Sequence, residues 1–135
     1  MKVTADTNIL VRAVTGDHLE QSNVAKAALR SAELIAMPIP ALCELVWVLS
    51  RGYKHSPSDI AEAIRRLING ANVIVDRPAV EAGLAILDEG GDFADGAIAY
   101  EGNWLGADTF VSFDKKAVHL LRGRGASARL LSVSA

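Results

Sequence analysis

Short apolar runs alternate with longer segments of helical periodicity along the whole chain. The apolar runs are bounded by polar or turn residues and predict strands over 2–6, 33–37, 72–76, 109–113 and 130–133. Between them, apolar residues recur every three or four positions and predict helices over 8–14, 18–31, 40–53, 56–68, 77–90, 93–103 and 115–122. Strands separated by helices are typical of a parallel sheet covered by helices. The pattern therefore predicts an α/β fold with a parallel central sheet flanked by helices.

Composition narrows the class of protein without identifying a function. The 135 residues are 50% hydrophobic and 22% charged, which is typical of a folded globular chain. No repeat or Pro/Gly-rich linker divides the sequence, so we predict a single domain over 1–135. The start does not resemble a secretory signal, and no apolar run approaches the length that spans a membrane. We therefore expect a cytoplasmic protein, and its single cysteine, Cys43, excludes an intrachain disulfide.

Four carboxylates occupy positions at which an isolated charge is unfavourable. Asp6 ends the first predicted strand and Asp114 follows the fourth. Glu44 is the one charge in an apolar helical stretch, and Asp95 lies near the start of a helix. The carboxyl ends of parallel strands meet at one edge of a sheet, where the sites of such folds lie. Carboxylates that converge there would repel one another unless a hard cation lay among them, so the sequence points to a Mg²⁺ or Mn²⁺ site.

Most of these acids also have an ordinary structural explanation. Asp6 and Asp114 each precede a predicted helix, so either could be a helix N-cap. Asp92 could cap the helix that begins at 93, with Asp95 as its partner in the first turn. Glu44 resists this interpretation because apolar side chains surround it in the helix. For the set of four we favour the metal site, whereas we interpret Asp92 as a cap first and a supporting ligand second.

Basic residues gather at the end of the chain. Residues 115–135 carry five basic and no acidic side chains, although the whole chain has a net charge of −2. A basic segment beside an acidic cluster could hold a phosphate backbone next to a metal. The candidates for such RNA binding are Lys115, Lys116, Arg122 and Arg124. Solvated surface charge is an equally open interpretation of this segment.

Trp47 follows Glu44 by about one helical turn. This position could line a substrate groove or a partner surface. Packing in the core or in a dimer is the more ordinary interpretation of a tryptophan in an apolar helix.

Four motifs give nearly the whole chain a resemblance to a known family. They are Asp6-Thr7-Asn8-Ile9-Leu10, Ala41-Leu42-Cys43-Glu44-Leu45, the segment from Asp92 to Ala99 (DFADGAIA), and the segment from Thr109 to Lys116 (TFVSFDKK). Each motif alone is weak, but their order and spacing are specific in combination. In this combination the chain resembles the PIN-domain ribonucleases, particularly the VapC-type toxins of bacterial toxin–antitoxin pairs. The resemblance implies a single PIN-like α/β domain.

The resemblance also implies an activity and the residues that carry it. The family's catalytic and metal-binding acids fall on Asp6, Glu44, Asp95 and Asp114. Its supporting positions fall on Asn8, Asp92 and Ser112. The implied activity is endonucleolytic hydrolysis of RNA phosphodiesters by a water activated by Mg²⁺ or Mn²⁺. The implied partners are an RNA substrate, a cognate antitoxin and a second copy of the chain. Gly96 departs from the larger residue that is common after Asp95, which affects local packing.

Three other functions fit parts of the sequence. A receiver-like signalling domain also binds Mg²⁺, but it needs an acidic pair after the first strand, and here Asp6 is followed by Thr7. A haloacid-dehalogenase-like phosphatase needs a second Asp at position 8, where Asn8 stands. A catalytically silent PIN scaffold is the remaining alternative. The presence of all four acids argues against it, and a cleavage assay with Mn²⁺ decides.

Overall fold

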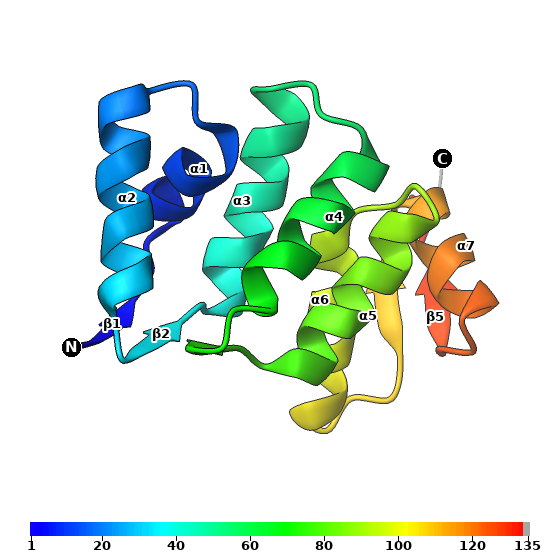
Figure 1. Cartoon of the computed structure of the whole chain (residues 1–135). Coiled ribbons are helices and arrows are strands. Elements are labelled where there is room, and N and C mark those ends of the chain that lie inside the picture. The colour runs from blue at the N-terminus through cyan, green and yellow to red at the C-terminus, as the bar shows by residue number, and fades with distance from the viewer. Residues whose placement is uncertain (134–135) are drawn as a thin grey trace. The chain divides into compact units, whose positions relative to one another are not determined.

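The computed structural model describes residues 1–133 and divides the chain into two compact units (Figure 1). The N-terminal unit comprises Met1–Asp76, and the C-terminal unit begins at Arg77. Both units contain helices and parallel strands, so the predicted α/β class is confirmed. Among the described residues, ladder hydrogen bonds form two sheets, of three and two strands, where the prediction had one central sheet. A single domain over residues 1–135 stays a prediction.

The N-terminal unit is built around a small parallel sheet. Its elements are β1 (Lys2–Thr4), α1 (Thr7–Thr15), α2 (Leu19–Ser31), β2 (Leu34–Ala36), α3 (Ile39–Arg51), α4 (Pro57–Ile68) and β3 (Val73–Ile74). The strand order is β1-β2-β3, with Val3 opposite Ile35 and Ile35 opposite Val73. The sheet places the carboxyl end of β1, and therefore Asp6, beside the carboxyl end of β2, which leads into α3.

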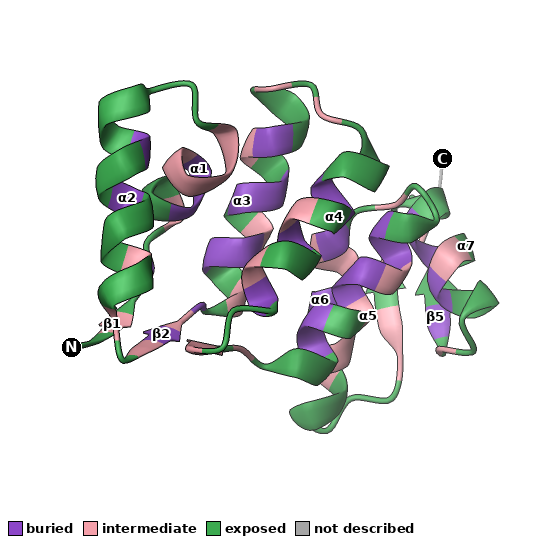
Figure 2. Ribbon diagram, viewed as in Figure 1, coloured by how far each residue is buried: buried purple, intermediate pink, exposed green. Residues whose placement is uncertain are grey.

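The core of the N-terminal unit comes from one face of each helix. Its largest fully buried side chains are Leu10, Ile35, Leu42, Leu45, Leu49, Ile60 and Ile64. The start of helix α4 is stabilised by its N-cap, because Ser56 Oγ accepts a hydrogen bond from Asp59 N at 3.1 Å. Pro57 occupies the first helical position, where its fixed backbone angle suits the helix. Helix α2 contributes only Ser22 and Ala25 as buried residues, and most of its surface is exposed (Figure 2).

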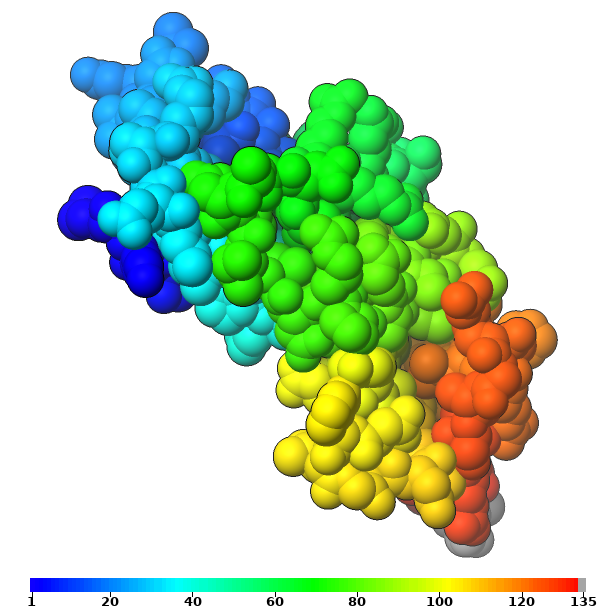
Figure 3. Space-filling model, turned by 60° about the horizontal axis from the view of Figure 1, so that its bottom comes forward, coloured from blue at the N-terminus to red at the C-terminus, as the bar shows by residue number. Residues whose placement is uncertain are grey.

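The C-terminal unit combines three helices with a two-stranded parallel sheet. Its elements are α5 (Arg77–Asp88), α6 (Phe93–Trp104), β4 (Phe110–Ser112), α7 (Lys115–Gly123) and β5 (Ala128–Leu130). One face of the sheet packs on a buried cluster formed by Ile86, Val118, Leu121 and Ala128, and Phe110 lies against that cluster. The end of α6 and the loop after it, yellow in Figure 3, lie at the surface, where Trp104 and Leu105 are exposed.

Two glycines allow α5 and α6 to approach closely. A Cβ atom added at Gly96 would lie 2.3 Å from the carbonyl oxygen of Ala82, and one at Gly83 would lie 2.7 Å from the ring of Phe93. Neither side chain could be accommodated without moving its neighbours. Glycine at 96 is therefore required by the packing of α6 on α5, which explains the departure noted in the sequence.

The last predicted strand is displaced along the chain. The apolar pattern predicted 130–133, whereas β5 spans Ala128–Leu130. Ala128 is buried in the cluster of the C-terminal unit, and its carbonyl accepts a hydrogen bond from Arg122 Nε at 2.8 Å. These contacts determine where β5 begins, and local strand propensity does not reveal them.

None of the helices in the described part of the chain has the length and apolar character that a bilayer-spanning segment requires.

Candidate functional site

Asp6 connects β1 to α1 and is exposed. Its backbone is extended, and its Oδ1 accepts a hydrogen bond from Thr7 N at 2.7 Å. Its carbonyl oxygen accepts the first intrahelical hydrogen bonds from Ile9 N and Leu10 N. Asp6 therefore caps α1, as the ordinary explanation predicted. Within residues 1–133, its second carboxylate oxygen, Oδ2, accepts no hydrogen bond.

Thr7 ties the start of α1 to Glu44 on α3. Its hydroxyl Oγ1 donates a hydrogen bond to Glu44 Oε2 at 3.3 Å. Glu44 is exposed, because the buried stripe of α3 runs along Ala41, Leu42, Leu45, Val46 and Leu49 and leaves position 44 outside it. The expectation that Glu44 lies on the apolar face of its helix is therefore wrong. Thr7 is a site residue that the sequence reasoning missed, although its place directly after Asp6 was a usable signal.

The predicted support of Asp6 by Asn8 stays a prediction. Among the described residues, no hydrogen bond joins the two side chains. Asn8 instead lines a hollow of about 720 Å³ in the N-terminal unit, together with Ile9, Arg12, His18, Glu20, Gln21, Val24 and Ala25. This hollow lies between α1 and α2, and neither Asp6 nor Glu44 lines it.

Two acids occupy the start of α6. Asp92 is the N-cap, and its Oδ1 accepts a hydrogen bond from Ala94 N at 3.1 Å. Asp95 lies in the first turn and is half-buried, and its backbone N donates to the carbonyl of Asp92 at 3.1 Å. Burial raises the pKa of the Asp95 carboxyl, and the negative charges of Asp92 and Asp114 raise it further. The interpretation of Asp92 as a cap is confirmed, and Asp95 is the acid whose ionised form the fold disfavours.

Ser112 and Asp114 form the turn between β4 and α7. The backbone N of Asp114 donates to Ser112 Oγ at 3.0 Å, and Asp114 Oδ1 accepts from Ala117 N at 3.0 Å. Asp114 therefore caps α7, and Ser112 holds Asp114 in place. The predicted role of Ser112 as a supporting residue near a metal stays a prediction.

The apolar sequence around the acids suggested burial, but the structure leaves most of the acids exposed. Asp6, Glu44, Asp92 and Asp114 are exposed, and Asp95 alone is partly buried. Within neither unit do three or more His, Cys, Asp or Glu side chains of the described residues gather closely enough to hold a metal ion. The structure shows a hydrogen-bonded link between Thr7 and Glu44, and electrostatic coupling of Asp92, Asp95 and Asp114. Metal binding by the four predicted acids stays a prediction.

The four basic candidates differ in their surroundings. All are exposed. Arg122 Nε bonds the Ala128 carbonyl, and Arg124 lies 3.9 Å from Glu89. Lys115 and Lys116 form no hydrogen bond or ion pair within residues 1–133. Among the four candidates, the two lysines are therefore the cations most available to a phosphate backbone.

Trp47 is 63% exposed on α3. Its predicted packing in the core of the chain is therefore wrong, since the indole lies outside the buried stripe of the helix. A place at a partner surface or in a substrate groove stays open.

The four acids and the motifs around them can be compared with known families. A family model described as the PIN domain matches residues 3–120. The chain belongs to the PIN domain family. All four predicted acids and Ser112 lie within the matched residues. PIN domains are commonly metal-dependent nucleases, and the family generally uses divalent metal ions. No curated protein matches the chain.

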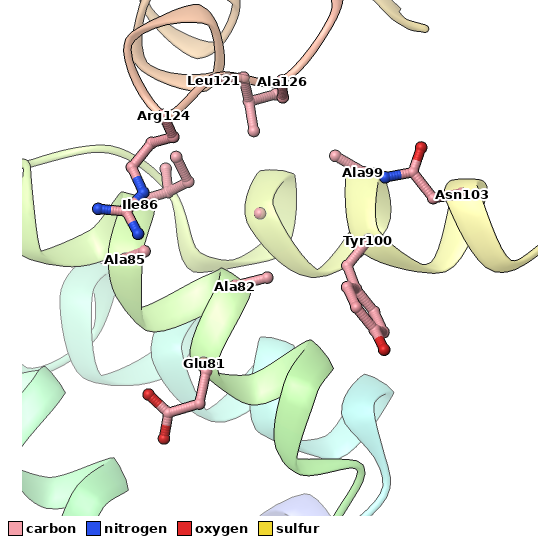
Figure 4. Close-up of a pocket in the computed structure, with 11 residues that line it drawn as sticks. Glu81, Ala82, Ala85, Ile86, Ala99, Tyr100, Asn103, Leu121, Arg124 and Ala126 are labelled. Atoms are coloured by element: carbon pink, nitrogen blue, oxygen red, sulfur yellow. The ribbon is translucent and has the colours of Figure 1, made fainter. Parts of the chain in front are cut away.

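A separate cavity of about 280 Å³ lies in the C-terminal unit of this PIN domain. It is lined by small or apolar residues of α5, α6 and the turn after α7, among them Ala82, Ala85, Ala99 and Ala126 (Figure 4). The polar residues of its lining are Glu81, Tyr100, Asn103 and Arg124. None of the four candidate acids lines it, and the acidic residue of its lining is Glu81.

Proposed function

We propose that this PIN domain is a metal-dependent endoribonuclease. Its proposed catalytic metal ligands are Asp6, Glu44, Asp95 and Asp114, and its proposed cofactor is Mg²⁺ or Mn²⁺. The observation that carries the proposal is the state of Asp95. Its carboxyl is partly buried beside two further acids, which raises its pKa, in a chain whose family commonly consists of metal-dependent nucleases. A fold that gathers acids against their own repulsion is expected to bind a cation there.

The donor set fits a hard divalent cation. Such cations prefer carboxylate oxygens, and all four proposed ligands supply them. Capping uses one oxygen each of Asp6 and Asp114, Oδ1 in both cases, which leaves Oδ2 of each for a metal. A cation near Asp95 would also stabilise its ionised form, which burial and the neighbouring charges disfavour.

The remaining site residues position these acids and the substrate. A bound divalent cation supplies a water of lowered pKa and offsets the negative charge that develops at phosphorus. Thr7 restrains the Glu44 carboxylate, and Ser112 restrains the backbone of Asp114. Lys115 and Lys116 follow Asp114 directly and can attract the RNA phosphates, with Arg122 and Arg124 as further exposed cations. In-line attack on phosphorus would leave a 5′-phosphate and a 3′-hydroxyl.

A cleavage assay on purified protein tests the proposal. We expect cleavage of structured RNA with single-stranded loops in Mg²⁺ or Mn²⁺, and none in EDTA. Asp6→Asn, Glu44→Gln, Asp95→Asn and Asp114→Asn should each abolish cleavage. Two exposed aspartates outside the set provide matched controls, Asp59→Asn in α4 and Asp108→Asn before β4, and both should cleave like the wild type. Undiminished cleavage in EDTA, or by any two of the four variants, would refute the mechanism.

The same assay separates this proposal from its alternatives. Membership of the PIN family removes the support for a receiver-like signalling domain. A catalytically silent PIN scaffold would give no cleavage in any metal, and none of the four substitutions would alter its behaviour in the assay.

We further propose that the chain is the toxin of a type II, VapBC-like toxin–antitoxin module. The support is the combination of motifs that resembles VapC-type toxins. The partners would then be a small antitoxin and a second copy of the chain. Because its substrate would be RNA, the toxin would act in the cytoplasm. Induced expression in a bacterial host should arrest growth, Asp95→Asn should not, and a small protein encoded directly upstream should restore growth. Continued growth during wild-type expression at a verified protein level would contradict the toxin role.

A further inference from the structure

Phe113 is an exposed aromatic residue placed between two site residues. It follows Ser112 and precedes Asp114, and 66% of its surface is accessible to solvent. Val111, two residues earlier in β4, is 55% exposed. By contrast, Phe110 packs on the buried cluster of the C-terminal unit. The outward side of this strand end therefore presents two exposed apolar side chains beside a proposed catalytic acid.

The backbone around Phe113 is held by hydrogen bonds on both sides. Asp114 N donates to Ser112 Oγ, and Asp114 Oδ1 accepts from Ala117 N, each at 3.0 Å. The last residue of the strand is held as well, since Leu131 N donates to the Ser112 carbonyl at 2.8 Å. Little backbone freedom therefore remains to be lost when a ligand contacts the ring. An aromatic residue on a restrained backbone is a better stacking surface than one on a flexible loop.

Three basic residues accompany this surface, in addition to the Asp114 carboxylate. Arg129 is the registered partner of Val111 in the β4–β5 ladder and shares its side of the sheet. Lys115 and Lys116 begin α7 immediately after Asp114, and both are exposed. No acidic residue occurs between 115 and 133. Proteins commonly hold single-stranded RNA with exposed aromatic rings that have basic residues near them, and Phe113 at the end of β4 has this combination.

We propose that Phe113 is a base-stacking residue that holds a nucleotide next to the phosphodiester to be cleaved. The inference rests on the proposed ribonuclease function and adds to it a residue that holds the bases of the unpaired RNA. Every base has a flat aromatic face, so the contact selects for single-strandedness and not for one sequence. The adjacent lysines hold the phosphates on either side of that nucleotide.

Binding to two probes of equal charge tests the stacking role. The first probe is a fluorescent 12-nucleotide unpaired RNA of mixed sequence, and the second is the same ribose-phosphate chain without bases. Anisotropy is measured in EDTA, so that metal-dependent cleavage does not consume the probe. Phe113→Ala and Phe113→Leu should weaken binding of the base-bearing probe about 5- to 150-fold. Phe113→Trp should retain binding, and all three variants should bind the abasic probe like the wild type.

A second exposed aromatic of the same unit is the matched control. Trp104, at the end of α6, is 76% exposed and is not adjacent to any proposed ligand. Trp104→Ala should bind both probes like the wild type. Thermal melts verify that each variant is folded, which is expected because Phe113 is exposed.

The possible outcomes distinguish the inference from the function on which it rests. Wild-type affinity of Phe113→Ala for the base-bearing RNA overturns the stacking role. An equal loss on both probes also overturns it, because bases are then not what the ring contacts. A change of oligomeric state in Phe113→Ala, seen by light scattering, identifies the surface as a contact between copies of the chain and overturns it as well. If any of these occurs while the wild type cleaves RNA in Mn²⁺, the nuclease proposal stands. If the wild type neither binds nor cleaves RNA, both proposals fail.

Discussion

Gly96 offers the sharpest test of how the fold positions the acids of α6. A Cβ atom at this position would lie 2.3 Å from the Ala82 carbonyl oxygen, 2.8 Å from its carbonyl carbon and 2.9 Å from Gly83 Cα. All three neighbours are backbone atoms of α5, so no side-chain rotation can relieve the contacts. The helices would have to separate by about 1 Å to restore ordinary van der Waals distances. Gly96→Ala should therefore displace the start of α6, which carries Asp92 and Asp95.

The expected loss of stability follows from two opposing terms. Overpacking of a core contact costs about 1–3 kcal/mol, and a clash with backbone belongs at the upper end of that range. Alanine gains about 1 kcal/mol over glycine in a helix interior. The net free energy of unfolding should fall by about 2 kcal/mol. An unfolding entropy of about 2.1 cal/mol/K per residue over 135 residues converts this into a fall in Tm of about 7 °C.

Gly102 in the same helix is the matched control. A Cβ atom at Gly102 would meet nothing within 4 Å, so Gly102→Ala should gain helix propensity without a clash and raise Tm by about 2–4 °C. Thermal melts of the three proteins measure both effects, and the cleavage assay measures whether moving α6 lowers activity. A Gly96→Ala protein that melts at or above the wild-type temperature would refute the close approach of α5 and α6.

Two further predictions separate the charge of an acid from its structural role. The pKa of Asp95 is raised in the folded state, so in EDTA a fall in pH should stabilise the wild type relative to Asp95→Asn. This stabilisation should be complete below pH 3.8 and should be lost as the pH rises through the raised pKa. Melts from pH 3 to 8 measure the difference, and an advantage that grew with pH would contradict the raised pKa. Asp114→Ala should lose both cleavage and the α7 cap, lowering Tm by about 2–7 °C for about 0.5–2 kcal/mol, whereas Asp114→Asn should keep the cap and lose only cleavage. Cleavage by Asp114→Asn at the wild-type rate would show that this acid is only a cap.

Part of the candidate site was predictable because the interactions that form it are local. An N-cap needs only an acceptor oxygen and the backbone N–H groups of the next few residues. For that reason the roles of Asp6, Asp92 and Asp114 as caps follow from their positions before helical patterns, and each is seen in the structure. The approximate positions of all seven described helices follow in the same way from apolar periodicity.

Other features of the site depend on contacts between residues far apart in the chain. The hydroxyl of Thr7 meets Glu44 across 37 positions, and the half-burial of Asp95 depends on how α6 packs in its unit. Which side of an apolar helix faces the core is also decided by its neighbours. Glu44 and Trp47 lie in an apolar run, yet both are exposed because α3 buries a different stripe.

The sequence by itself determined the α/β class and the helix caps, because hydrophobic period and capping chemistry are properties of neighbouring residues. Tertiary structure alone decided where β5 begins, why residue 96 must be glycine and which acid is partly buried. These outcomes depend on steric exclusion and desolvation between elements that meet only after folding. Neither effect has a signature in the local pattern of the chain.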